Sequence, residues 1–99
     1  MSTFAEIKQR KLAAMTPSER AAYEEAYATT TLALAVGEQV RDARENLGLS
    51  QRDLAVRMGT SQAAVARLEA GGVGATLTTL QKVAAALDLH VAVEFSRAS

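Results

Sequence analysis

The stretch LSQRDLAVRMGTSQAAVARLEAG, residues 49–71, constrains the fold more than the rest of the chain together. Gly59 lies near its centre, where a sharp change of direction needs a positive φ that glycine adopts without steric cost. Ala55 is small enough to let two helices cross closely, whereas a larger side chain would push them apart. The stretch therefore predicts two short helices, over 51–58 and 62–69, joined by a tight corner.

A serine precedes each of these helices in the position of an N-cap. Leu54 and Met58 give the first helix one apolar stripe, and Val65 and Leu68 give the second helix another. Once both stripes face inward, the second helix directs four side chains outward: Gln62, Ala63, Ala66 and Arg67. This is the geometry of a helix-turn-helix, whose second helix enters a DNA major groove. Two packed helices of an unrelated bundle would explain the apolar spacing alone.

The stretch resembles the Cro/lambda-repressor-type helix-turn-helix of the XRE (xenobiotic response element) family. The matching features are LSQ at 49–51, LA at 54–55, MG at 58–59, TS at 60–61, Val65, and RLEAG at 67–71. Thr60 departs from the pattern, because the family more often has an aliphatic residue there. The resemblance implies an all-α, five-helix lambda-repressor-like fold.

The resemblance also implies which side chains bind DNA. Gln51 is expected at a backbone phosphate, with Thr60 and Ser61 near phosphates, and the outward face of the second helix is expected at base edges. The residue types suit this, since a glutamine amide can pair with adenine, an arginine fork with guanine and an alanine methyl with thymine. The complete candidate set is Gln51, Arg52, Thr60, Ser61, Gln62, Ala63, Ala66 and Arg67. Arg44 and Glu69 match an ion pair that phage repressors of this type use structurally.

The charge balance limits the expected affinity for DNA. The 99 residues contain 11 Lys and Arg against 11 Asp and Glu, so the formal net charge is zero. A DNA-binding protein commonly has a basic excess that neutralises phosphates. We therefore expect modest affinity per monomer and a dependence on dimerisation.

Other classes of function find no support in the residues. The only histidine, His90, has no partners at metal-ligand or catalytic spacing, and there is no cysteine. We expect no enzyme, no metal and no cofactor. The longest apolar run, Leu32–Val36, is too short to span a bilayer, and no signal peptide is evident, so a cytoplasmic protein is expected.

The remaining helices follow from capping signals. Thr16 and Pro17 begin a helix-compatible region that reaches Asn46, and Gly48 ends it. The three threonines at 29–31 predict a bend, a break or a frayed joint, because β-branched side chains are restricted in a helix. A helix over 32–47 would then place Leu32, Val36, Val40 and Leu47 in the core. A last helix begins at Thr76 or Thr78.

The tail alternates apolar and polar residues from His90 onward and predicts a β-strand. Val91, Val93 and Phe95 share one face of it. A lone strand lacks a ladder partner, so pairing with the same strand of a second copy is expected, which would form a two-fold dimer suited to a palindromic operator. A frayed tail folded onto its own domain is the alternative.

The whole layout resembles HigA-type antitoxins of toxin–antitoxin pairs, and the tail is similar to the HipB type, in which the tail strands pair across the dimer. The carrying segments are MTPSERAAYEEAY at 15–27 and TLTTLQKVAAALDLHVAVEF at 76–95. On that resemblance an N-terminal arm binds a ribonuclease-type toxin, with Tyr23 and Tyr27 at the contact, since tyrosine is favoured at interfaces. Packing of both tyrosines against the protein's own core or across the dimer is the alternative.

Three segments are therefore predicted: an arm over 1–31 for toxin binding, an XRE domain over 32–89, and a dimerisation strand and tail over 90–99. The expected function is a sequence-specific repressor that acts as antitoxin and autoregulator of its operon. Two alternatives remain: a stand-alone XRE-family regulator without a toxin, and an interaction adaptor that has lost DNA binding.

Overall fold

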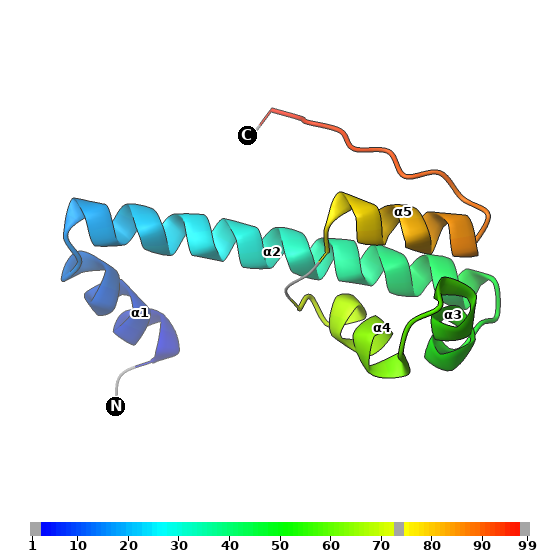
Figure 1. Cartoon of the computed structure of the whole chain (residues 1–99). Coiled ribbons are helices and arrows are strands. Elements are labelled where there is room, and N and C mark those ends of the chain that lie inside the picture. Colours follow the sequence, from blue (N-terminus) through cyan, green and yellow to red (C-terminus); the bar gives the residue numbers. More distant parts are fainter. Residues whose placement is uncertain (1–2, 73–74, 98–99) are drawn as a thin grey trace. The chain divides into compact units, whose positions relative to one another are not determined.

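The structure is a computed structural model that describes residues 3–72 and 75–97. The described residues form five helices and no strand (Figure 1). In chain order these are α1 (Phe4–Ala13), α2 (Pro17–Asn46), α3 (Gln51–Met58), α4 (Gln62–Glu69) and α5 (Leu77–Ala86). The two ends of the predicted arm and tail, residues 1–2 and 98–99, lie outside the described residues. No helix in the described ranges is both long and apolar enough to cross a membrane.

The chain divides into two compact units between Thr31 and Leu32. The first unit contains α1, which the sequence analysis did not predict. Its start is a capping box, in which the Thr3 hydroxyl accepts the Glu6 N–H at 3.1 Å and the Glu6 carboxylate accepts the Thr3 N–H at 3.2 Å. The signal was present as a threonine followed three residues later by a glutamate.

The predicted break at residues 29–31 is wrong, because α2 runs without interruption from Pro17 to Asn46. The hydroxyls of Thr29, Thr30 and Thr31 each donate to the backbone carbonyl four residues earlier, at 2.9 Å. These bonds satisfy the hydroxyls within the helix instead of leaving them to compete with its backbone, and threonine has a second helical rotamer for this purpose.

The second unit is built around eight buried apolar side chains: Val40, Leu54, Ala55, Val65, Leu68, Val83, Ala84 and Leu87. The predicted apolar stripes of α3 and α4 supply Leu54, Val65 and Leu68. Two expected core members of α2 are not buried, since Leu32 is 65% exposed and Leu47 is 52% exposed. The inward side of α2 is set by Val40 instead, and Val36 packs partly against the cluster.

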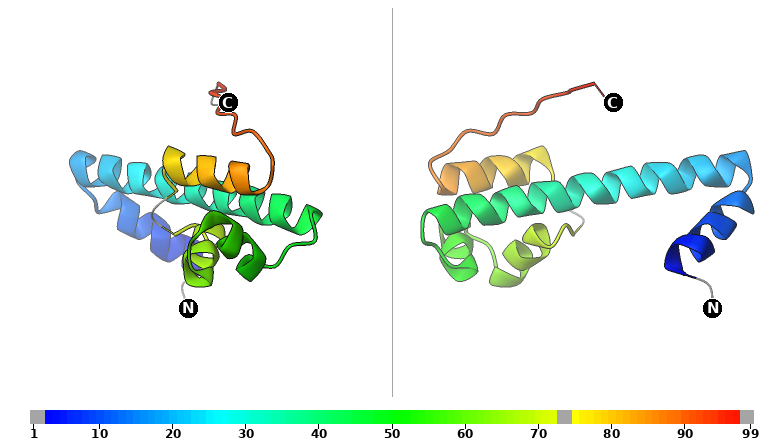
Figure 2. Two further views of the ribbon diagram at one scale, coloured as in Figure 1. Left: turned by 45° about the vertical axis from the view of Figure 1, so that its right-hand side comes forward. Right: turned by 180° about the vertical axis from the view of Figure 1, so that it is seen from behind.

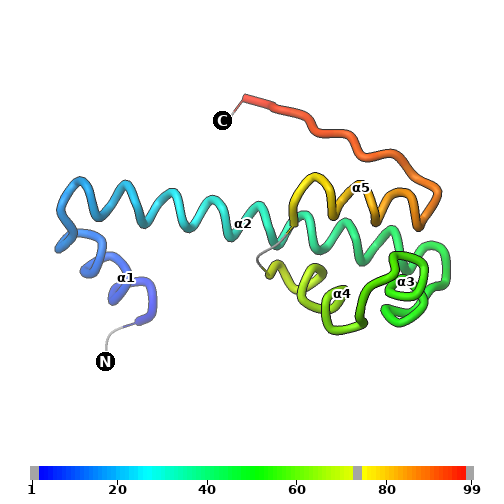
Figure 3. The backbone as a smooth tube through the Cα atoms, viewed as in Figure 1, coloured from blue at the N-terminus to red at the C-terminus, as the bar shows by residue number. Residues whose placement is uncertain are grey.

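The corner between α3 and α4 has the predicted form (Figure 3). Ser50 caps α3 reciprocally with Asp53, and the two hydrogen bonds measure 2.9 and 3.0 Å. Gly59 adopts φ 69°, and the N–H groups of Gly59 and Thr60 donate to the carbonyls of Val56 and Ala55. This is a Schellman ending, which needs a left-handed residue at the position of Gly59. The helix bounds 51–58 and 62–69 are confirmed.

Gly37 lies inside α2 at a point where α4 ends against it. A Cβ atom added there would lie 2.5 Å from the Glu69 carbonyl oxygen and 2.6 Å from that of Leu68. Any larger residue would therefore collide with the backbone of α4. The sequence analysis missed this position, although a glycine inside a helical pattern is a signal of close packing.

Residues 89–97 follow α5 as an extended segment (Figure 2). The described residues of the single chain contain no strand, so the predicted strand over the tail is absent here. The physical reason is that a strand needs a neighbour for its backbone hydrogen bonds, and no described part of this chain provides one. The side chains of Val93 and Phe95 are 64% and 95% exposed.

Candidate nucleic-acid interface

One flank of α4 faces solvent along its whole length. Gln62, Ala63 and Arg67 are exposed and Ala66 is partly exposed. The opposite flank carries Val65, Leu68 and Glu69, all buried. The buried flank therefore packs α4 against the rest of the second unit. The flank with the polar and alanine side chains is free to enter a groove of DNA.

The N-terminus of α4 is fixed by Ser61, whose hydroxyl oxygen accepts the Ala64 N–H at 3.1 Å. Ser61 and Thr60 are both exposed. A capping hydroxyl still has its own hydrogen to donate, so Ser61 can cap the helix and offer a donor to a phosphate together. Arg52, at the second position of α3, is also exposed.

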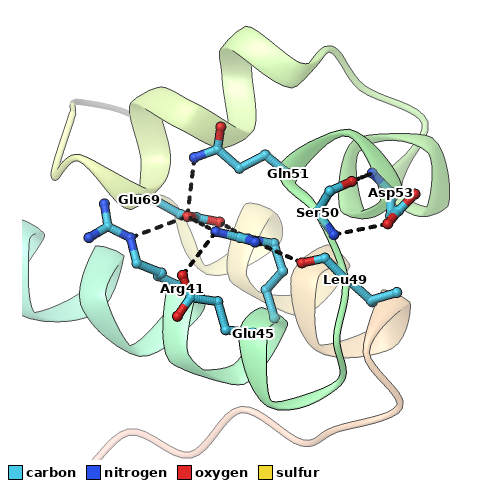
Figure 4. A network of polar contacts seen from close by, with 8 residues as sticks. Arg41, Glu45, Leu49, Ser50, Gln51, Asp53 and Glu69 are labelled. Carbon is cyan, nitrogen blue, oxygen red and sulfur yellow. Dashed lines mark hydrogen bonds and ion pairs between the residues drawn. The ribbon is translucent and has the colours of Figure 1, made fainter.

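A buried carboxylate behind this surface joins three helices (Figure 4). Arg44 of α2 donates to Glu69 from Nε at 2.7 Å and from Nη2 at 2.8 Å, a two-pronged contact. Arg44 also donates to the Leu49 carbonyl at 2.7 Å. Gln51 of α3 donates from Nε2 to the same carboxylate at 3.3 Å, and Arg41 forms an ion pair with it at 3.5 Å. The network fixes the end of α4 relative to α2 and the start of α3.

The protonation of Glu69 reflects these contacts. Burial alone would raise the pKa of this carboxyl, but the hydrogen bonds from Arg44 and Gln51 and the nearby positive charges outweigh burial, and the pKa is lowered. The hydrogen bond to Glu69 likewise raises the pKa of Arg44. Both groups are charged at neutral pH, so the contact is an ion pair. Among the described residues, every buried polar side-chain atom has a hydrogen-bond partner.

The structure brings together only part of the predicted site. Gln51, expected at a phosphate, lies half-buried with its amide turned to Glu69. Its second amide hydrogen and its carbonyl oxygen have no role in that hydrogen bond, so the contact orients the side chain without using up its donors. Arg57 lies farther along α3 and donates to the Ala86 carbonyl at 3.2 Å, where it helps to end α5.

Arg41 is the network member that neither the predicted DNA-binding set nor the predicted ion pair included. Its side chain is 48% exposed, while the Glu69 side chain beneath it is fully buried. Arg41 and Arg44 are one helical turn apart on α2, and this spacing was the only sequence signal. Among the described residues no group of His, Asp or Glu side chains is arranged to hold a metal ion.

Thr60 lies beside a cavity of about 230 Å³ between α4 and its neighbours. Met58, Leu68 and Thr79 also line it, and so does Arg67 of the exposed flank. An aliphatic side chain at position 60 would add apolar contact at this place, whereas the threonine leaves it open.

Two short helices crossing at a glycine corner, with the second helix exposed along one flank, define the helix-turn-helix class of DNA reader. A family model described as helix-turn-helix matches residues 40–93, more than half of the chain. The protein belongs to this helix-turn-helix family, of the XRE type, and is a DNA-binding transcription regulator. A search of curated proteins and a search of solved structures each found no match.

Proposed function

We propose that the protein is a dimeric, sequence-specific repressor that acts as the antitoxin and autoregulator of a toxin–antitoxin operon. The DNA-reading part of this proposal is supported by the exposed flank of α4. Arg67 and Gln62 have the donors that recognise guanine and adenine, and Ala63 has the methyl that meets thymine. Gln51, Arg52, Thr60 and Ser61 border the same flank and contact the phosphates.

The experiment for DNA reading is a mobility-shift titration with the DNA upstream of the protein's own gene, at several salt concentrations. We expect a specific shift whose affinity falls as salt rises, because Arg and Lys contacts to phosphates release counterions. Equal affinity for the upstream DNA and for a scrambled duplex of the same length would refute sequence-specific repression.

Dimerisation through the tail supports binding to a palindromic operator. The tail has alternating apolar residues and unpaired backbone groups, and a second copy supplies the missing neighbour. Two-fold symmetry then places two α4 helices on two half-sites. This also compensates for the zero net charge, since two copies double the phosphate contacts.

The arm supports the antitoxin role. No residue over 3–31 is buried, so this unit has no core of its own. Phe4 is 83% exposed, Ile7 is 54% exposed and Tyr27 is 58% exposed. Tyr27 stacks with Tyr23 at 6.4 Å between ring centroids and lies under the Lys8 ammonium at 4.8 Å. A ten-residue helix without buried side chains is marginal by itself, so a protein partner that covers these side chains would stabilise it.

The partner proposed is a ribonuclease-type toxin encoded by the adjacent gene. Co-purification of that gene product with the full chain tests the idea, and substitution of Phe4, Ile7 and Tyr27 by alanine should weaken the complex at least about tenfold while DNA binding is retained. Gln9→Ala, on the exposed surface of α1, is the matched control. Retention of the complex by the triple variant would refute the arm as the contact surface.

Two alternatives differ from this proposal in the partner. A stand-alone XRE-type regulator retains DNA binding but has no adjacent toxin gene, and the arm then packs across its own dimer. An adaptor that has lost DNA binding is favoured by the zero net charge and by the two alanines in the exposed flank of α4. Absence of any specific shift at low salt would favour the adaptor.

A further inference from the structure

A groove runs between α2, α5 and the tail within the second unit. Its volume is about 330 Å³, and its walls are mainly apolar side chains of the two helices, including Val36, Val40, Val83 and Leu87. Tail residues 89–94 form its third side. Leu32, the largely exposed residue that the sequence analysis had placed in the core, lies in this lining. The floor of the groove belongs to the buried core, whereas Leu32 and Leu89 at its edge are 65% and 48% exposed in the single chain.

The tail has unpaired backbone groups and exposed apolar side chains. Its residues 91–97 have no ladder partner in the described structure, and the side chains of Val91, Val93 and Phe95 are 39%, 64% and 95% exposed. One chain therefore carries both an apolar groove and an exposed apolar strand. Such a self-complementary pair is what a two-fold contact between identical copies requires.

We propose that the tail of a second copy closes this groove, as an antiparallel strand in the register that places Ala92 of the two copies opposite each other. This inference rests on the proposed dimer and adds to it the position of each residue. In this register Val91 lies opposite Val93 of the second copy, and Leu89 lies opposite its Phe95. The two-fold axis makes each contact twice, so four apolar pairs fall on one face of the two strands.

A polar pair on the other face of the strands favours this register. His90 lies opposite Glu94 of the second copy, and the two-fold axis makes this contact twice. Imidazole donates a hydrogen bond to a carboxylate in either of its protonation states. Opposite pairs across a strand contribute to sheet stability, and like charges directly opposite destabilise it.

Neighbouring registers lose these pairs. Centring the contact on Val93 places Leu89 opposite Arg97 and leaves Glu94 opposite an alanine. Centring it on Glu94 places two carboxylates face to face, which is destabilising. A slip by one residue places Val93 opposite His90 and Leu89 opposite Glu94, so the apolar pairs are lost.

The second copy's Phe95 gains most from this arrangement. It is the most exposed apolar side chain of the described residues, and opposite Leu89 it lies beside the groove that Leu87 and Leu89 line. An aromatic ring covered in this way removes a large apolar area from water. Phe95→Ala should weaken dimerisation about 100-fold or more, since two rings are lost per dimer, whereas Val56→Ala on the exposed surface of α3 should leave it unchanged.

Disulfide trapping tests the register, because the full chain contains no cysteine. Opposite residues in an antiparallel pair have Cβ atoms about 4.5–5.5 Å apart, close enough to be joined after a small adjustment. We expect A92C to form a covalent dimer at least about tenfold faster than V93C under mild oxidation. V56C, on the exposed surface of α3, is the control that measures disulfide formation by random collision of two molecules.

The outcomes separate this inference from the proposed dimer. Faster trapping of V93C than of A92C overturns the register while the dimer stands. A dimer by sedimentation that neither cysteine traps above the V56C rate overturns the groove contact. A protein that sediments as a monomer overturns the dimer and this inference together.

A charge-exchange cycle tests the same register without cysteines. H90E places two carboxylates opposite each other and should weaken dimerisation about 5- to 30-fold, because two symmetric contacts are lost. H90E/E94K restores an opposite pair and should recover most of that loss. Both positions are exposed in the single chain, so its folding is unaffected. Equal dimer affinity for H90E and the double variant would overturn the pairing of His90 with Glu94.

Discussion

Gly37→Ala separates two effects that oppose each other at one position of α2. In an ordinary helix interior, alanine is about 1 kcal/mol more favourable than glycine. At position 37 the added Cβ would lie 2.5 and 2.6 Å from two backbone carbonyl oxygens of α4, and 2.9 Å from the Glu69 carbonyl carbon. Only a shift of α4 away from α2 relieves this contact, and that shift strains the bond of 2.7 Å between Arg44 and Glu69.

Overpacking of a tight core lowers the unfolding free energy by about 1–3 kcal/mol. Backbone atoms move less readily than side chains, so we take the upper end of this range. After the gain in helix propensity, the net loss of unfolding free energy is about 2 kcal/mol. In thermal unfolding this lowers Tm by about 8–16 °C for a domain of this size. Ala35→Gly, an exposed position of the same helix, measures the propensity term and should cost about 1 kcal/mol. A Gly37→Ala variant as stable as the parent would refute the close approach of the two helices.

Three further predictions concern single side chains. Ser50→Ala removes the cap of α3 and should cost about 1 kcal/mol in denaturant unfolding; a loss below about 0.3 kcal/mol would contradict the capping box. Glu69→Gln leaves the charge of Arg44 buried without its partner and should cost about 3 kcal/mol at pH 7. Because the pKa of Glu69 is lowered on folding, that stabilisation is fully present above the ordinary pKa of 4.5 and is lost as pH falls through the lower folded value; a difference between parent and variant that stays constant from pH 7 to about pH 3 would exclude the ion pair as its source. Thr60→Ile adds apolar contact at the cavity and should raise the unfolding free energy by about 1 kcal/mol; no gain in Tm would mean that the cavity is not filled by this side chain.

The elements that local chemistry specifies were predictable from the sequence. The bounds of α3 and α4 follow from two serine caps, one glycine corner and short apolar stripes, all within about 20 residues. The start of α5 at Thr76 follows from the same kind of signal. The start of α1, which was not predicted, has the same kind of local signal in Thr3 and Glu6.

Features that depend on contacts distant in sequence were not predictable. The need for glycine at position 37 arises from the end of α4, more than 30 residues later. Leu32 has the right helical spacing for the core, yet it lies beside an open groove, because spacing fixes the face of a helix and not what covers it. The threonine run illustrates a third limit, since weak propensity does not break a helix whose hydroxyls find carbonyl acceptors.

The network around Glu69 was predictable only in part. The ion pair with Arg44 came from a resemblance to phage repressors, while the contacts from Gln51 and Arg41 became visible only once three helices were in place. Gln51, which we propose as a phosphate contact, is oriented by its hydrogen bond to Glu69 in this network. The predicted tail strand is absent from the described residues of the single chain, because its backbone groups have no neighbour to pair with.

The central claim is that the exposed flank of α4 reads DNA sequence, and the affinity of Arg67→Ala for specific and scrambled duplexes tests it most directly. Arg20→Ala, an exposed arginine of the arm, is the matched control for the lost charge. The account predicts that Arg67→Ala weakens specific binding about 5- to 150-fold, with a much smaller loss on scrambled DNA, whereas Arg20→Ala changes the preference between them by less than about twofold. Unchanged discrimination by Arg67→Ala, together with unchanged discrimination by Gln62→Ala, would contradict the account.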